Sequence, residues 1–189
     1  RGFSIPFQDR PPGRIPSGIP LPEAAKSVPA FDLPAVWFPY RKAGMSATDI
    51  ACDQTVGRFG PFDEQLFVGD FTMAEINRVH LEQVDGAYQG AVVPFRDDFQ
   101  CAIVRLAWGA DGSLFQTNRG WNSAGNTSYG LQRIVWTGAT PFEILKINAL
   151  SNGFRISFTE PVDPSTATPE SFAGSSYTYT YHNRYGSDE

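Results

Sequence analysis

Residues 36–138 consist of short apolar runs separated by Gly, Asp and Asn turns, and they show no sustained helical periodicity. This pattern constrains the fold most strongly, because it predicts many short strands and almost no helix. The predicted strands cover residues 65–69, 75–81, 87–95, 102–108, 113–117 and 129–136. Asp111-Gly112 predicts a tight hairpin turn, since such turns require positive φ angles that Asp and Gly tolerate. Strands in this succession are typical of the small antiparallel sheets that form propeller blades.

The two ends of the chain differ from this middle part. Nine of the 15 prolines fall within the first 39 residues, and proline lacks an amide donor and favours extended neighbours. Residues 1–35 are therefore expected to be extended, with at most a short helical turn over 21–27. After residue 138, strands are predicted at 142–147 and 154–158 around a turn at 151–153. Alternating Tyr and Thr predict a further strand over 171–181.

The sequence thus predicts an all-β chain in three parts. Residues 1–35 form a Pro-rich extended segment, residues 36–138 the last two or three blades of a partial β-propeller, and residues 139–189 the start of an Ig/fibronectin-like β-sandwich. A complete sandwich of this kind has about seven strands in roughly 100 residues. Only about half of one fits after residue 138, so we expect the chain to be a piece of a longer protein.

Charge and cysteine content narrow the classes of partner. A net charge of −5 with scattered basic residues gives no field that would attract nucleic acid. No run of about 18 apolar residues is present, so no membrane span is predicted. Cys52 and Cys101 are far apart and lack the spacing of zinc or thioredoxin motifs. They are interpreted as two buried thiols, with a disulfide as the alternative in an oxidising compartment.

Three stretches, in the same order, resemble the glucose/sorbosone dehydrogenase family. Residues 36–39 (VWFP) with 43–46 (AGMS) are similar to its W-P-x-x-A-P-S-G segment. Residues 66–71 (LFVGDF) with 76–79 (INRV) are similar to one of its strand pairs, and residues 105–115 (RLAWGADGSLF) to a hairpin ending in P-D-G-x-L-Y. The resemblance covers about residues 35–136. It implies a six-bladed propeller that carries pyrroloquinoline quinone (PQQ), found in exported, extracellular or periplasmic proteins.

The residues that hold the quinone in this family do not carry over. Where the family has a Lys and two Arg residues, this chain has Thr72, Ala102 and Val104. A hydroxyl and two apolar groups do not supply the positive field that a tricarboxylate needs. The family's general-base His belongs to an early blade outside this segment. We therefore expect no cofactor in this segment and no catalytic residue, with PQQ and calcium confined to the parent protein.

Candidate ligand-binding residues lie where a predicted strand runs into a Gly/Asn/Ser-rich loop. Asn118, Arg119 and Trp121 combine an amide, a guanidinium and an aromatic ring, which can stack on a sugar and bond its hydroxyls, or bind a protein partner. The alternative is that Trp121 only caps the propeller end.

The remaining polar groups have structural interpretations. His80 and His182 lie in different predicted parts and form no zinc motif or catalytic triad. The acidic pairs 63–64 and 97–98 lack the spacing of a calcium loop and are interpreted as solvated turns, so no metal site is predicted. Arg105 and Arg133 are expected to form hydrogen bonds between blades.

Two functions from different classes follow. The first is a fragment of an exported propeller whose parent is a PQQ-dependent sugar or alcohol oxidoreductase, in which hydride passes to the quinone. The second is a non-catalytic propeller module that binds carbohydrate or a protein partner. In both, the rest of the parent propeller is an expected partner. A structural spacer is a third alternative, and fold alone does not decide among them.

Overall fold

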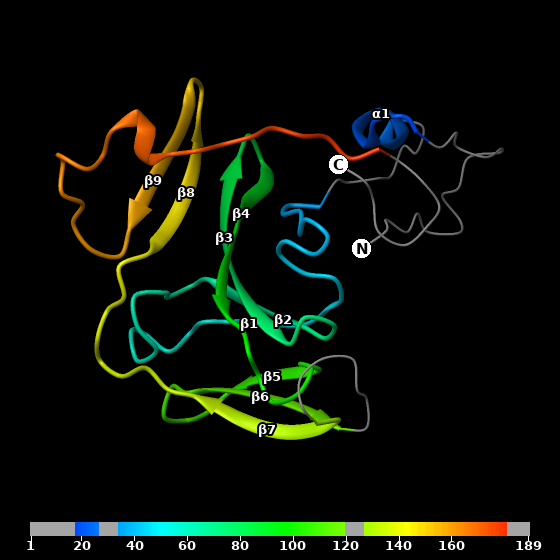
Figure 1. Cartoon of the computed structure of the whole chain (residues 1–189), viewed down its shortest axis with the longest axis vertical. Helices are drawn as coiled ribbons and strands as arrows, with labels where there is room; N and C mark the ends of the chain where they lie inside the picture. Colours follow the sequence, from blue (N-terminus) through cyan, green and yellow to red (C-terminus); the bar gives the residue numbers. More distant parts are fainter. Residues whose placement is uncertain (1–17, 27–33, 120–126, 181–189) are drawn as a thin grey trace. The chain divides into compact units, whose positions relative to one another are not determined.

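The computed structural model describes residues 18–26, 34–119 and 127–180. The chain divides into two compact units, residues 35–163 and residues 1–34 with 164–189. The described part is all-β, with three antiparallel sheets, none of them closed, and almost no helix (Figure 1). The predicted boundary at residue 138 stays a prediction.

The first sheet is a four-stranded meander. Its strands are β1 (Ala47–Cys52), β2 (Leu66–Asp70), β3 (Glu75–Val84) and β4 (Ala87–Arg96), in spatial order β1-β2-β3-β4. Asp85 and Gly86 join β3 to β4 with φ angles of 49° and 84°, the left-handed conformations of a two-residue hairpin turn. This turn lets β3 run beyond the predicted end at residue 81. The β3–β4 register shifts by one residue at Ile76/Asn77, which is a bulge.

The second sheet follows the predicted hairpin. It contains β5 (Arg105–Trp108), β6 (Leu114–Arg119) and β7 (Tyr129–Ile134). Gly112 in the β5–β6 turn has φ +85°, and a Cβ at this position would come within 2.7 Å of the Arg58 Cβ. The Asp111 carboxylate accepts hydrogen bonds from the backbone and hydroxyl of Ser113. A turn at Asp111-Gly112 is thus confirmed, but only Gly112 has the positive φ expected for both residues, and glycine is also required by the close approach of Arg58.

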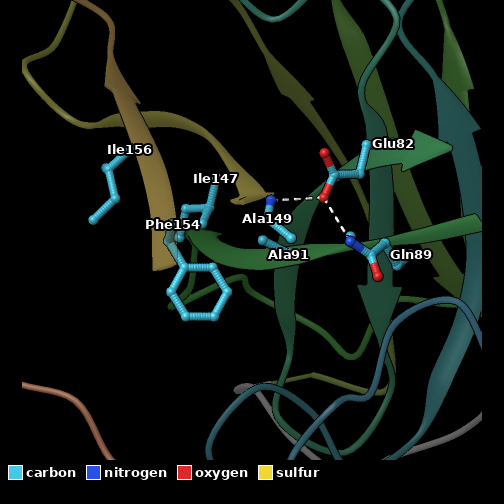
Figure 2. A pocket seen from close by; sticks show the side chains of 8 residues that line it. Glu82, Gln89, Ala91, Ile147, Ala149, Phe154 and Ile156 are labelled. Carbon is cyan, nitrogen blue, oxygen red and sulfur yellow. Dashed lines mark hydrogen bonds between the residues drawn. The ribbon is translucent and has the colours of Figure 1, made fainter. Parts of the chain in front are cut away.

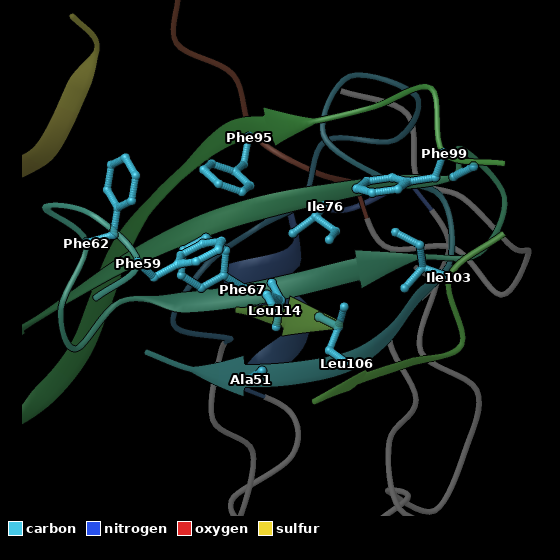
Figure 3. Packing of buried hydrophobic residues seen from close by; sticks show 11 residues of the cluster. Ala51, Phe59, Phe62, Phe67, Ile76, Phe95, Phe99, Ile103, Leu106 and Leu114 are labelled. Carbon is cyan, nitrogen blue, oxygen red and sulfur yellow. The ribbon is translucent and has the colours of Figure 1, made fainter. Parts of the chain in front are cut away.

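The core lies between these two sheets. Phe67 and Ile76 of the first sheet are fully buried, as are Leu114 of the second sheet and Ile103 in the segment before it (Figure 3). The surrounding aromatic rings meet edge to face, for example Phe67 and Phe95, whose centroids are 5.0 Å apart at 76°. A Cβ on residue 69 would lie 2.4 Å from Ile103 Cγ2. Glycine at this position therefore allows the segment before β5 to pack against β2.

The opposite face of the second sheet is exposed. Along β7 and just beyond it, alternate side chains point away from the core, and Tyr129, Leu131 and Val135 are 66%, 68% and 55% exposed. Phe115 of β6 pairs with Arg133 of β7 and shares this face, because directly paired residues lie on the same side of a sheet. One face of the sheet is thus packed on the core, and the other presents apolar side chains to solvent.

The third sheet is the hairpin of β8 (Ile144–Leu150) and β9 (Gly153–Phe158). It begins two residues later than predicted and turns at the predicted residues 151–153. Phe142 stacks on Phe158 with ring centroids 5.3 Å apart. The hairpin belongs to the same compact unit as the first two sheets.

The described residues of the other unit contain little regular structure. Helix α1 (Leu21–Ala25) is the short turn expected over 21–27, and the backbone N–H of Leu21 donates to the carbonyl of Tyr179 at 2.8 Å. The strand predicted over 171–181 is wrong for the described residues: after the 3-10 turn η2 (Pro169–Ser171) only Thr180 forms a bridge, to Pro20. A strand needs a hydrogen-bonding neighbour, and proline lacks an N–H to extend the ladder.

Candidate functional site

Thr72, Ala102 and Val104 match the positions that hold the quinone in glucose/sorbosone dehydrogenases, and in this structure they lie near the end of β2. Thr72 follows β2, and its backbone N–H donates to the Asp70 carboxylate at 2.8 Å. Ala102 is fully buried, Val104 is half-buried, and Ile103 between them donates its N–H to the Asp70 carbonyl at 3.4 Å. Asp70 thus links Thr72 to the segment that holds Ala102 and Val104.

The Asp70 carboxylate is buried and accepts four backbone hydrogen bonds. Oδ2 accepts from Met45 at 2.8 Å and Ser46 at 2.6 Å, and Oδ1 accepts from Thr72 and Met73 at 2.8 Å each. These neutral donors solvate the negative charge without a cation. Asp70 thus ties the segment before β1 to the β2–β3 turn.

Arg78 on β3 fixes the β8–β9 hairpin to the first sheet. Its side chain is fully buried and lies over the Phe62 ring, with the guanidinium 4.3 Å from the centroid. Nη1 donates to Gln65 Oε1 at 2.5 Å and to the Leu145 carbonyl at 2.9 Å, and Nη2 donates to the Ile144 carbonyl at 2.5 Å. Burial lowers the pKa of Arg78, and the nearby Glu143 carboxylate, 3.7 Å from Nη2, opposes that shift.

A second set of polar contacts joins the outer part of β3 to β8. Glu82 accepts hydrogen bonds from the Ala149 backbone at 2.8 Å, Asn148 Nδ2 at 2.7 Å and Gln89 Nε2 at 2.8 Å. These bonds lower the pKa of Glu82 to about 2, so the side chain is ionised at neutral pH. Asn148 Nδ2 also lies 3.3 Å from His80 Nε2. Burial, followed by the charge of Lys146, lowers the pKa of His80.

These contacts hold open a groove of about 440 Å³ between β4 and the β8–β9 hairpin (Figure 2). Glu82 and Gln89 provide polar groups, and Ile147, Ile156 and Phe154 provide apolar walls. Phe154 is 74% exposed, so most of its ring is accessible to a ligand. The groove combines an ionised carboxylate, an amide and an aromatic face within one concave surface.

Sequence reasoning did not identify this groove. It placed residues 75–81, 87–95 and 154–158 in strands but gave no sign that Glu82, Gln89 and Phe154 come together. Two features of the sequence could have indicated it. A hairpin turn at Asp85-Gly86 brings residues 82 and 89 opposite each other, and Phe154 lies at a solvent-facing position of an alternating strand.

The candidate residues from the sequence are only partly described. Asn118 lies on β6 and is buried, facing the core side of the sheet. Arg119 ends β6, and Trp121 and its loop lie outside the described residues, as does His182. The proposed role of Asn118, Arg119 and Trp121 stays a prediction.

The expected inter-blade bonds of Arg105 and Arg133 are not found among the described contacts. Arg105 donates to the carbonyl of its own neighbour Val104, and Arg133 contacts Asp111 and Ser113 of the same sheet. Both arginines lie on the exposed face of the second sheet, so they point away from the first. The buried arginine that does link two sheets is Arg78.

The two cysteines and the two acidic pairs do not come together in one site of the described structure. Cys101 is buried, Cys52 is half-buried, and both are free. Burial and the neighbouring Asp53 raise the pKa of Cys52. Asp63 accepts a hydrogen bond from the Gly57 backbone, while Asp97 and Asp98 are exposed. In the described ranges, no three His, Cys, Asp or Glu side chains gather as a metal ion would require.

Within the described residues, no helix has the length and apolar character needed to cross a membrane. Comparison of the chain with protein-family models, with curated proteins and with solved structures finds no match.

Proposed function

We propose that this chain is part of an exported propeller of the glucose/sorbosone dehydrogenase type, and that it acts as a non-catalytic module that binds carbohydrate in the groove between β4 and the β8–β9 hairpin. The observation that carries the binding function is the exposed ring of Phe154 beside the side chains of Glu82 and Gln89. The rest of the parent propeller is its expected structural partner.

The packing of the first two sheets supports the propeller part of the proposal. Successive blades of a propeller are small antiparallel sheets that pack face to face. Here a four-stranded and a three-stranded meander follow each other along the chain and share one apolar core. The exposed Tyr129, Leu131 and Val135 lie on the far face of the second sheet, where the next blade would pack. The β8–β9 hairpin would then open the Ig-like sandwich.

The surroundings of Asp70 support a non-catalytic module. An anionic quinone with three carboxylates needs cations, and the matching positions hold Thr72, Ala102 and Val104. Ala102 has no exposed surface with which to contact a ligand. The Asp70 carboxylate would repel the cofactor, because in the described ranges its charge is balanced by backbone N–H dipoles and not by a cation.

The groove has the groups that carbohydrate recognition uses. An aromatic ring can lie against the C–H face of a sugar, and fixed carboxylate and amide groups can bond its hydroxyls. Glu82 Oε2 accepts one hydrogen bond among the described contacts, from Asn148, and so keeps acceptor capacity for a hydroxyl. Gln89 donates through Nε2 to Glu82, which fixes the orientation of its amide. The polar groups are therefore held in place before a ligand arrives.

An array of neutral mono- and oligosaccharides tests this function, followed by isothermal titration calorimetry with the oligosaccharide that binds best. We expect saturable binding that weakens at least about tenfold in Phe154→Ala, because the stacking surface is lost. Phe172→Ala is the matched control: Phe172 is also exposed, at 49%, but lies outside the groove. No binding above background, or equal affinity of Phe154→Ala and wild type, would contradict the proposal.

A further inference from the structure

A second cleft lies on the first two sheets, away from the groove. It has a volume of about 310 Å³ and lies between the end of β4 and the segment that follows β7. Its walls include Phe59, Phe62, Phe95, Ile134 and Trp136. This volume is near the lower end of the range for small-molecule sites, which suits a ligand with one or two rings.

The floor of the cleft is a rigid set of aromatic rings. Phe59 and Phe95 have centroids 6.0 Å apart at 48°, and Phe62 and Phe95 are 5.7 Å apart at 83°. All three rings are at most 9% exposed, so the core holds them in place and only a small part of each faces the cleft. The Arg78 guanidinium covers one face of Phe62 and the Arg96 guanidinium one face of Phe95, so the floor offers the remaining exposed parts of these rings to another aromatic ring.

Trp136 forms a wall of the cleft. Its Nε1 donates to the Ala139 carbonyl at 3.0 Å, which fixes the indole and leaves its faces for apolar contacts. A Cβ on Gly60 would lie 3.6 Å from the indole, so the backbone of Gly60 packs directly against this ring. Trp136 is half-buried and lines the cleft.

Arg96 is the only ionisable residue among those that line the cleft in the described part of the chain. It is exposed, and its guanidinium lies 4.8 Å from the Phe95 centroid, with Nη1 donating to the Phe95 carbonyl at 2.6 Å. A guanidinium has five N–H donors, so most remain for a ligand. Glu75 and Asp97 share a smaller cavity with Arg96, and neither lines this cleft. Arg96 is thus the one charged group that lines the cleft among the described residues, while Glu75 and Asp97 lie on the other side of its side chain.

We propose that this cleft binds a small planar aromatic carboxylate. The ring lies between the phenylalanine floor and Trp136, and the carboxylate accepts hydrogen bonds from Arg96. An apolar neutral ring would lose the charge-assisted bonds, and a cationic ring would be repelled. This binding is independent of the carbohydrate groove, since the two sets of lining residues share no member.

The test uses 2-naphthoate as the probe and 2-naphthamide as its neutral counterpart, with binding followed by calorimetry and ligand-observed NMR. We expect saturable binding of 2-naphthoate, and at least about tenfold weaker binding of the amide to wild type and of 2-naphthoate to Arg96→Gln. Arg105→Gln is the matched control, because Arg105 is also an exposed strand arginine that donates to the preceding carbonyl. Leu131→Gln controls for the exposed apolar face of β7.

Circular dichroism establishes that each variant is folded, and Trp136→Leu provides a second disruption of the cleft. Weaker binding in both Arg96→Gln and Trp136→Leu, with unchanged binding in both controls, supports the proposal. Unchanged affinity in Arg96→Gln, equal affinity for the amide, or no saturable binding at millimolar 2-naphthoate would overturn it.

Discussion

Replacing Arg78 with methionine is expected to lower the free energy of unfolding by at least about 3 kcal/mol. Methionine is apolar and of similar length, so it fills much of the volume but donates no hydrogen bonds. The Ile144 carbonyl and the amide oxygen of Gln65 would lose the hydrogen bonds from Arg78 inside the protein, while the Leu145 carbonyl would keep its bond from Gln65 Nε2. Urea denaturation followed by circular dichroism measures the effect.

The control for this change is Arg133→Met. Arg133 is also a strand arginine with two side-chain partners, Asp111 and Ser113, but its side chain is 49% exposed. Its replacement is expected to cost no more than about 1 kcal/mol, because water can satisfy the groups left behind. Hydrogen exchange adds a local readout: in Arg78→Met, the amides of β8 should exchange faster than those of β6. A loss below about 1 kcal/mol in Arg78→Met would contradict the anchoring role of Arg78.

Replacing Asp70 with alanine is expected to destabilise the protein by about 3 kcal/mol or more. Four backbone N–H groups, those of Met45, Ser46, Thr72 and Met73, would lose their acceptor at once. Asp70→Asn keeps one acceptor oxygen and turns an N–H₂ group towards the other two donors, so we expect a loss of about 2 kcal/mol. The measurement is the urea midpoint, with the slope checked to be unchanged.

Asp98→Asn is the matched control for Asp70. Asp98 is exposed and has a positive φ of 56°, a conformation that asparagine also adopts readily. Its replacement should change the free energy of unfolding by less than about 0.5 kcal/mol. Equal effects of Asp70→Asn and Asp98→Asn would show that the four backbone bonds contribute little to stability.

The strands were predictable where side chains alternate or form apolar runs between turn residues. The order of β2 to β9 and the turns at 110–113 and 151–153 follow from such local signals. Strand β1 was missed because Asp49 interrupts a weakly apolar run. In the structure the Asp49 carboxylate accepts a hydrogen bond from the Leu106 backbone at 3.0 Å, so Asp49 connects β1 to β5. No local pattern reveals a contact across so many residues.

The functional groups were harder to predict for the same reason. Arg78 was visible only as part of a strand motif, because its partners at Ile144 and Leu145 lie on another sheet. The groove needs Glu82 and Phe154 on different hairpins. The residues Thr72, Ala102 and Val104 were readable from the sequence, but the backbone bonds of the Asp70 carboxylate next to Thr72 were not. In the sequence Asp70 is only the last residue of a strand, and its role becomes clear from the four backbone N–H groups that donate to it in the structure.

The most direct test of the proposal that this chain is a non-catalytic module without a quinone site is a titration of the protein with PQQ in the presence of Ca²⁺, following the absorbance of the cofactor. A quinone-dependent glucose dehydrogenase serves as the positive control. Because Thr72, Ala102 and Val104 supply no cation and Asp70 adds a negative charge, we expect absorbance to rise linearly, with no saturable change at tens of micromolar PQQ. Saturable binding at a fixed stoichiometry would contradict the claim and identify the chain as part of a quinone-dependent oxidoreductase.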